Sequence, residues 1–323
     1  MAILRSLASL PASYPLQYEM SSASEVFPQY LIHAGDAVQS YNSLEEWQTN
    51  FADPLSFAWR SKRMHSPPAI LYAHGNHDQD TTNRYIYTTG PRKGENWFSA
   101  TLGTARFIVL DSQPLHLFKA QLDWLQRETR LETWNRASFR IAIVHIAPFI
   151  EYWEPRAWEE LGEKHWGDYV RTQLVPILMS GGVDLIISGH QHAYSRGWIS
   201  NEMAKELTKD ELKTNVNNNR HRKRVHLIRN HWERRRNLQG KDNFTYSVGR
   251  LREGTMITVI GGAGGELDSE RVEDWGFYET SLTGRYNFAV ITLAREGSCL
   301  MWRAYDASTQ LIDKFDLVRT YDD

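Results

Sequence analysis

Short apolar runs alternate with amphipathic stretches from about residue 27 to residue 190. Apolar runs of four to six residues are typical of buried strands, and apolar residues three or four positions apart indicate helices. The predicted strands are 27–32, 69–73, 97–100, 105–110, 140–144 and 183–187, and the predicted helices are 42–51, 118–133 and 169–179. This alternation predicts an α/β fold built on a layered sheet.

The remainder of the chain has a different pattern. Residues 255–260 are a further predicted strand, which runs into a glycine-rich segment at 261–265. Apolar runs within 286–318 predict a closing antiparallel β meander. A polar stretch at about 201–247 separates the two patterns. We therefore predict that 1–323 form a single domain carrying this stretch as an insertion.

One helix has a recognisable start. Ser43 is followed three positions later by Glu46, the spacing of a capping box at the beginning of the 42–51 helix. At the N-terminus, apolar residues at helical spacing within 3–10 predict a short amphipathic helix.

Composition narrows the class of protein. The 41% of hydrophobic residues is enough for a full core, and the net charge of -2 gives no global attraction to nucleic acid or membranes. A single cysteine, Cys299, excludes an internal disulfide framework and a thiolate metal cluster. No apolar run reaches the length of a transmembrane helix, and the N-terminal segment does not resemble a signal peptide. These features favour a cytoplasmic location and no membrane partner.

Polar side chains follow several of the predicted strands. They are Asp36, Asn76, His77, Asp78, His145, His190 and His192. Ligands of open α/β sheets collect beyond the carboxyl ends of the strands, so we expect these groups to share one site. Carboxylate, amide oxygen and imidazole nitrogen suit a divalent ion of the Zn, Mn or Fe class. Two such ions sharing a carboxylate would hold a phosphate group and activate a water molecule.

The same positions carry a resemblance to a known family. The segments Gly35-Asp36, Gly75-Asn76-His77-Asp78, Val144-His145 and Gly189-His190-Gln191-His192 are similar, in order and spacing, to four of the five blocks of the calcineurin-like metallophosphoesterase superfamily. The extensions 190–196 and 260–265 resemble its purple acid phosphatase-like branch. The resemblance implies a sandwich of two β-sheets flanked by helices. It also implies hydrolysis of a phosphorylated substrate by a metal-activated water.

The resemblance implies specific metal ligands. Asp36 would bridge two divalent ions, and His192 would serve one of them. The other ion would be completed by three further ligands, namely Asn76, His145 and His190. Considered alone, His145 is more typical of a core histidine with a satisfied hydrogen bond, and the flanking strand and Pro148 are what favour its role as a ligand.

The resemblance also implies two catalytic residues. His77 would approach the substrate phosphate and assist the leaving oxygen, while Asp78 would orient the His77 ring. The alternative interpretation of His77-Asp78 is a helix-capping pair, which the preceding Gly75-Asn76 disfavours.

Two departures from the family pattern affect the expected site. The family opens with an Asp-x-His or Asp-x-Gly block, but no aspartate precedes Asp36, and the one earlier histidine, His33, belongs to the strand that leads to it. We therefore expect the fold to lack its first strand and the His192 site to be incomplete. Secondly, Tyr41 lies two positions beyond the tyrosine of purple acid phosphatases, so we expect no tyrosinate–iron site.

Three functions remain open. The motifs favour a metal-dependent phosphoesterase. The missing block favours a catalytically impaired or truncated relic that acts as a binding protein. Residues 220–241 contain nine basic residues and one acidic residue, a pattern of a solvated insertion or of a segment that binds nucleic acid or another polyanion.

Overall fold

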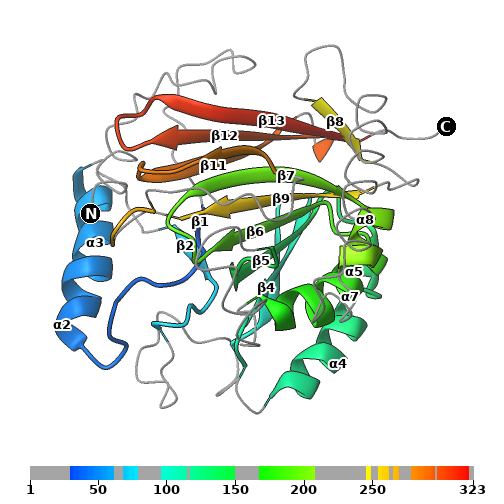
Figure 1. The fold of residues 1–323 in the computed structure, drawn as a ribbon, viewed down its shortest axis with the longest axis horizontal. Helices are drawn as coiled ribbons and strands as arrows, with labels where there is room; N and C mark the ends of the chain where they lie inside the picture. The colour runs from blue at the N-terminus through cyan, green and yellow to red at the C-terminus, as the bar shows by residue number, and fades with distance from the viewer. Residues whose placement is uncertain are drawn as a thin grey trace, which may run out of the picture.

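The computed structural model describes residues 30–61, 68–78, 96–114, 117–149, 167–207, 245–248, 254–261, 265–268, 278–294 and 297–319. Within these ranges the strands form three sheets of seven, four and two strands, with helices along one side of the largest sheet (Figure 1). The predicted sandwich of two β-sheets flanked by helices is confirmed.

The seven-stranded sheet has the order β10-β7-β9-β6-β5-β4-β3. Its strands are β3 (Phe98–Leu102), β4 (Ala105–Leu110), β5 (Arg140–Ile146), β6 (Leu185–Gly189), β7 (Tyr194–Ser200), β9 (Gly254–Ile260) and β10 (Tyr278–Leu282). The central strands β4, β5, β6 and β9 are parallel, whereas β3 and β7 pair antiparallel with their neighbours. Parallel strands in the middle of a sheet bury both faces, and every residue of β5 is buried.

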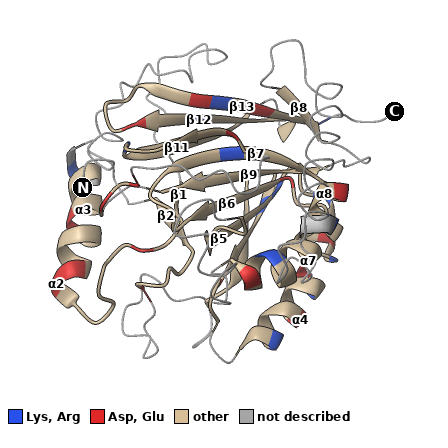
Figure 2. Ribbon diagram, in the orientation of Figure 1, with Lys and Arg blue, Asp and Glu red and all other residues tan. Residues whose placement is uncertain are grey.

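The four-stranded sheet contains the predicted C-terminal meander. Strands β11 (Asn287–Ala294), β12 (Cys299–Asp306) and β13 (Leu311–Arg319) pair antiparallel, and β8 (Thr245–Val248) adds to β13 in parallel. Acidic and basic side chains alternate along β13, so this strand carries no stripe of one sign (Figure 2).

The two-stranded sheet carries the first polar clusters. Strands β1 (Tyr30–His33) and β2 (Ala69–Tyr72) are parallel, and among the described residues they form a sheet separate from the other two. Residues 1–29, which include the predicted helix at 3–10, lie outside the described residues. The expected loss of a first strand therefore stays a prediction.

The helices fall into two groups. One continuous helical segment follows β1 and consists of α2 (Leu44–Glu46), the π-helical turns η2 (Trp47–Ala52) and α3 (Asp53–Ser61). The second group covers the seven-stranded sheet (Figure 1) and comprises α4 (Phe118–Glu128), α5 (Glu132–Asn135), η3 (Val170–Leu174), α7 (Val175–Ser180) and α8 (Asn201–Leu207). None of the helices within the described ranges is long and apolar enough to cross a membrane.

Both faces of the central sheet are packed, and β6 shows how. Ile186 lies in the core shared with the helices, whereas its neighbours Leu185 and Ile187 lie in the core shared with Trp302 and Phe315 of the four-stranded sheet. Successive side chains of a strand point to opposite faces, so one apolar run supplies both cores.

The ends of the polar stretch at 201–247 belong to packed elements. In α8, Met203 and Ala204 are buried, and β8 is hydrogen-bonded to β13. The predicted insertion boundaries at 201 and 247 are therefore too wide. Residues 208–244, including the basic segment 220–241, lie outside the described residues, so a role in polyanion binding stays a prediction.

Candidate metal centre

The predicted ligands lie at the carboxyl ends of parallel strands. Asp36 follows β1, Asn76 follows β2, His145 is the last residue but one of β5, and His190 directly follows β6. This placement agrees with the position in which open α/β sheets hold ligands.

Four of the five predicted ligands converge on one point. The Nε2 atom of His145 lies 3.0 Å from Oδ2 of Asp36, 3.1 Å from Oδ1 of Asn76 and 3.2 Å from Nδ1 of His190. Ligand atoms of Asp36, His145 and His190 all lie within 4.8 Å of one another. Donor atoms bound 2.0–2.2 Å from a single ion are about 3.0–3.5 Å apart, which is the spacing found here.

The His145 ring is prepared to act as a ligand. Its Nδ1 lies 2.6 Å from the carbonyl oxygen of Ala34, which can only accept, so Nδ1 carries the proton. In the neutral ring, Nε2 then presents a lone pair to the carboxylate of Asp36. A proton on Nε2 joins His145 to the Asp36 carboxylate in the absence of an ion, and a bound cation would take the place of that proton. Metal-bound histidines commonly donate their other N–H to a backbone carbonyl. The residues therefore fit a divalent ion.

Burial and local charge set the protonation of the cluster. Burial and the charge of His145 lower the pKa of His190 to about 3, which keeps that ring in the neutral form that binds metal. Burial raises the pKa of Asp36, but the hydrogen bond and charge of His145 outweigh it, so the pKa is lowered and Asp36 is ionised. Burial lowers the pKa of His145, and the hydrogen bond with Asp36 more than offsets it.

Two of the ligands have an unusual backbone. Asp36 has φ 55 and His190 has φ 70, in the left-handed region that residues other than glycine seldom occupy. Such strain is found where the surrounding structure fixes a functional side chain. Gly75 permits the close approach of the two loops, since a Cβ atom there would lie 2.5 Å from the backbone nitrogen of Asp36.

The Asp78 carboxylate holds the Asp36 loop, and none of its hydrogen bonds to other described residues reaches the His77 ring, so its predicted role in orienting His77 stays a prediction. Its Oδ2 accepts hydrogen bonds from the backbone of Asp36 at 2.6 Å and of Gly75 at 3.0 Å, and from the Tyr72 hydroxyl at 2.6 Å. Its Oδ1 accepts from the backbone of Ala37 at 3.0 Å.

The His77 ring contacts Gln39. Its Nδ1 lies 3.0 Å from the backbone oxygen of Gln39 and 3.1 Å from the Nε2 atom of the same residue. The backbone N–H of His77 donates to Oδ1 of Asp36 at 2.9 Å. The residue is thus anchored to the metal cluster through its main chain and to Gln39 through its ring.

His192 lies outside the converging group. Its backbone N–H donates to Oδ2 of Asp268 at 3.0 Å, and its Nδ1 is hydrogen-bonded to the carbonyl oxygen of Glu266. Among the described residues, the group able to hold an ion comprises Asp36, His145 and His190 without His192. No sequence motif pointed to Glu266 or Asp268, which lie in the loop after β9, more than 70 positions from His192.

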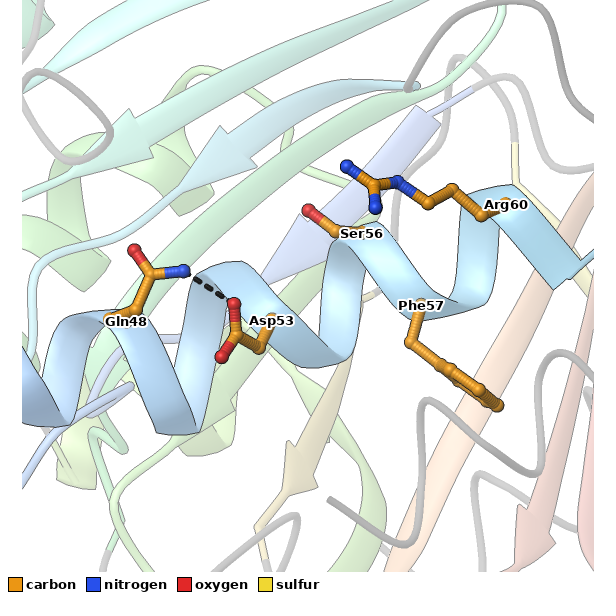
Figure 3. Close-up of a pocket in the computed structure, with 5 residues that line it drawn as sticks. All are labelled: Gln48, Asp53, Ser56, Phe57 and Arg60. Carbon is orange, nitrogen blue, oxygen red and sulfur yellow. Dashed lines mark hydrogen bonds between the residues drawn. The ribbon is translucent and has the colours of Figure 1, made fainter.

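A separate pocket lies along the outer side of the helical segment η2–α3. It has a volume of about 550 Å³, and the described residues that line it all belong to that helical segment, shown in Figure 3: Gln48, Asp53, Ser56, Phe57 and Arg60. None of the predicted site residues lines it, and Gln48 donates a hydrogen bond to Asp53 within it.

The fold and the converging ligands are those of a metallophosphoesterase. The chain belongs to the calcineurin-like phosphoesterase family, whose model matches residues 20–194, more than half of the 323 residues.

Comparisons with individual proteins agree with this assignment. Serine/threonine-protein phosphatase CPPED1 of Mus musculus is 24% identical over 187 residues, and its Homo sapiens counterpart is 23% identical over 189 residues. Each match covers 54% of this chain and 56% of the relative, so the chain spans about half the length of these proteins.

Two solved structures share the fold. The purple acid phosphatase PPD1 from Lupinus luteus seeds superimposes with a TM-score of 0.61 at 17% identity, covering 91% of this chain and 47% of that one. GAP50, described as the anchor in the inner membrane complex of Plasmodium, gives a TM-score of 0.50 at 12% identity, with 91% and 79% covered.

Proposed function

We propose that this chain is a metal-dependent hydrolase of phosphate esters. The observation that supports it most directly is the convergence of Asp36, Asn76, His145 and His190 at the strand ends of a phosphoesterase fold. A divalent ion bound there would polarise the phosphate and lower the pKa of a water molecule near phosphorus.

The protein residues have separable tasks in this proposal. Asp36, Asn76, His145 and His190 would hold one ion, and Asp36 and His192 would hold a second. His77 protonates the leaving oxygen, because its main chain is fixed beside Asp36 while its Nε2 makes no hydrogen bond to any described residue. Asp78 keeps Asp36 in its strained conformation.

Phosphomonoesters are the proposed substrate class. The relatives that share this part of the fold are named serine/threonine-protein phosphatases, which makes a phosphorylated serine or threonine peptide the first natural substrate to test.

Metal content and turnover of purified protein test the proposal together. We expect bound metal and hydrolysis of p-nitrophenyl phosphate after incubation with Zn²⁺, Mn²⁺ or Fe²⁺. His145→Ala should lose both metal and turnover. His77→Ala should keep the metal and lose turnover of phenyl phosphate, whose leaving group needs a proton, by roughly 10²–10⁴-fold, the usual contribution of a general acid. Wild-type protein that binds metal stoichiometrically but hydrolyses neither p-nitrophenyl phosphate nor phosphopeptides would contradict the proposed activity.

A binding protein with an incomplete centre is the second candidate. It is favoured by the absence of His192 from the group of described residues whose ligand atoms all lie within 4.8 Å of one another. GAP50, which shares the fold, is described as an anchor. This candidate predicts calorimetric binding of a single ion per chain and no turnover of any phosphate ester.

A further inference from the structure

The segment between Asp36 and the first helix fixes one residue beside the His77 ring. Gln39 presents two groups to the Nδ1 atom of His77, a backbone carbonyl at 3.0 Å and a side-chain amide nitrogen at 3.1 Å. The carbonyl accepts when Nδ1 carries a proton, and the amide donates when it does not. When His77 gives up a proton through Nε2, Nδ1 keeps its own proton; the carbonyl of Gln39 accepts it, and the side-chain amide can turn its oxygen toward it, so both groups hold the ring in this form.

The backbone of Gln39 is held on both sides. Val38 is buried in a cluster with Trp47 and Phe51, which anchors the chain just before Gln39. On the other side, Glu46 accepts hydrogen bonds from the backbone N–H groups of Gln39 at 2.8 Å and Ser40 at 2.9 Å. The Gln39 side chain is exposed, but its main chain is fixed by these contacts.

The use of Glu46 differs from an ordinary capping box. Ser43 accepts from the backbone N–H of Glu46 at 3.1 Å, as the sequence predicts. The carboxylate of Glu46, however, bonds to residues 39 and 40, and the backbone N–H of Ser43 donates to the carbonyl of Ser40. The helix start is therefore joined to the turn that faces His77.

We propose that Gln39 is the positioning residue of His77, holding the Nδ1 side of the ring so that Nε2 faces the substrate. This inference rests on the proposed phosphoesterase function for its kinetic consequence. Its geometric part, the contact between Gln39 and the His77 ring, is independent of turnover. Gln39 contacts the His77 ring, so in this proposal it acts through His77.

Gln39→Met tests the role because it keeps the backbone carbonyl and removes the amide donor at similar size. Two substrates separate positioning from general damage: phenyl phosphate, whose leaving group needs a proton, and p-nitrophenyl phosphate, whose leaving group does not. We expect kcat for phenyl phosphate to fall about tenfold, a fraction of the contribution of a general acid. The kcat for p-nitrophenyl phosphate should change less than threefold, with both KM values unchanged.

Two controls accompany the variant. Gln48→Met makes the same substitution on the neighbouring helix, where it removes the side-chain hydrogen bond to Asp53 (Figure 3). This variant should leave kcat unchanged for both substrates. In a His77→Ala background, Gln39→Met should have no further effect, because residues that act through one group are not additive.

NMR of the histidine rings tests the contact between Gln39 and His77 without measuring turnover. In protein labelled with ¹⁵N-histidine, the ring signals of His77, assigned by their loss in His77→Ala, should shift in Gln39→Met and stay in place in Gln48→Met. If the wild type hydrolyses nothing, the proposed function fails and the ring signals alone decide the positioning role. Unchanged His77 ring signals in Gln39→Met would overturn the inference. So would an equal fall in kcat for both substrates that is also seen in the His77→Ala background.

Discussion

Asp78→Asn is the most direct test of how this fold holds its metal ligands. The substitution keeps the size of the side chain and removes its charge. In the wild type, the Asp78 carboxylate accepts four hydrogen bonds, three of them from backbone N–H groups around Asp36. The change therefore acts on the loop that places Asp36 without touching a ligand.

The magnitude follows from these contacts. An amide oxygen in the place of Oδ2 keeps the three bonds made there, but the amide nitrogen then faces the N–H of Ala37, where Oδ1 accepted at 3.0 Å. Loss of one hydrogen bond to a charged acceptor costs about 1.5–3 kcal/mol. Burial raises the pKa of Asp78 despite the hydrogen bond from Tyr72, so removing the charge returns part of that free energy. We expect a net loss of about 1–3 kcal/mol in the free energy of unfolding.

Metal affinity should respond more strongly than stability. Residues that orient a ligand without binding the metal typically change affinity by about 10–100-fold when mutated. Competition with a chromophoric chelator measures the affinity, and urea denaturation of metal-free protein measures the stability. Tyr72→Phe is the matched control, since it removes a single donor from Oδ2 and leaves all three backbone donors paired.

The reasoning has a clear point of failure. If Asp78→Asn loses the expected stability but binds metal as tightly as the wild type, Asp78 supports the fold and does not position Asp36.

Three further predictions follow from other contacts. Gly75→Ala should release metal, because the new Cβ would lie 2.5 Å from the Asp36 nitrogen; unchanged affinity would show that the loops can separate. Arg196→Met should cost about 3–5 kcal/mol in urea denaturation, since it leaves the carboxylate of Asp313, 2.6 Å away and buried, without its charge partner; Arg196→Met with Asp313→Asn should recover part of that loss. Burial raises the pKa of Asp184 from 3.8 to about 6, so its contribution to stability is complete below pH 3.8 and falls by up to about 3 kcal/mol as pH rises to 6. The unfolding free energy of the wild type minus that of Asp184→Asn should decline across this window and be level above it, and a flat difference would contradict the raised pKa.

The convergence of the ligands was predictable from the sequence because it depends on short, local patterns. A buried strand followed by a polar cluster places that cluster at the sheet edge, whichever strands are neighbours. Asp36, Asn76, His145 and His190 meet for this reason. The meander of β11 to β13 was predictable on the same basis, from apolar runs separated by turns.

Other elements could not be predicted from local sequence patterns. The edge strand β10 has the sequence YETSL, and its strand conformation comes from pairing with β7. The packed ends of the polar stretch, α8 and β8, are likewise fixed by neighbours that are distant in the chain.

The sequence by itself determined the ligand types, their order and the α/β class, because residue chemistry and hydrophobic period act within a few positions. Only the tertiary structure decided which of these side chains are hydrogen-bonded to each other or to the main chain. It pairs the His77 ring with Gln39 and gives the Asp78 carboxylate to the Asp36 loop. It also brings Asp36, His145 and His190 within 4.8 Å of one another, a group that does not include His192. These choices depend on distances between loops far apart in the chain, where a buried polar group bonds with whichever partner the packing brings within reach.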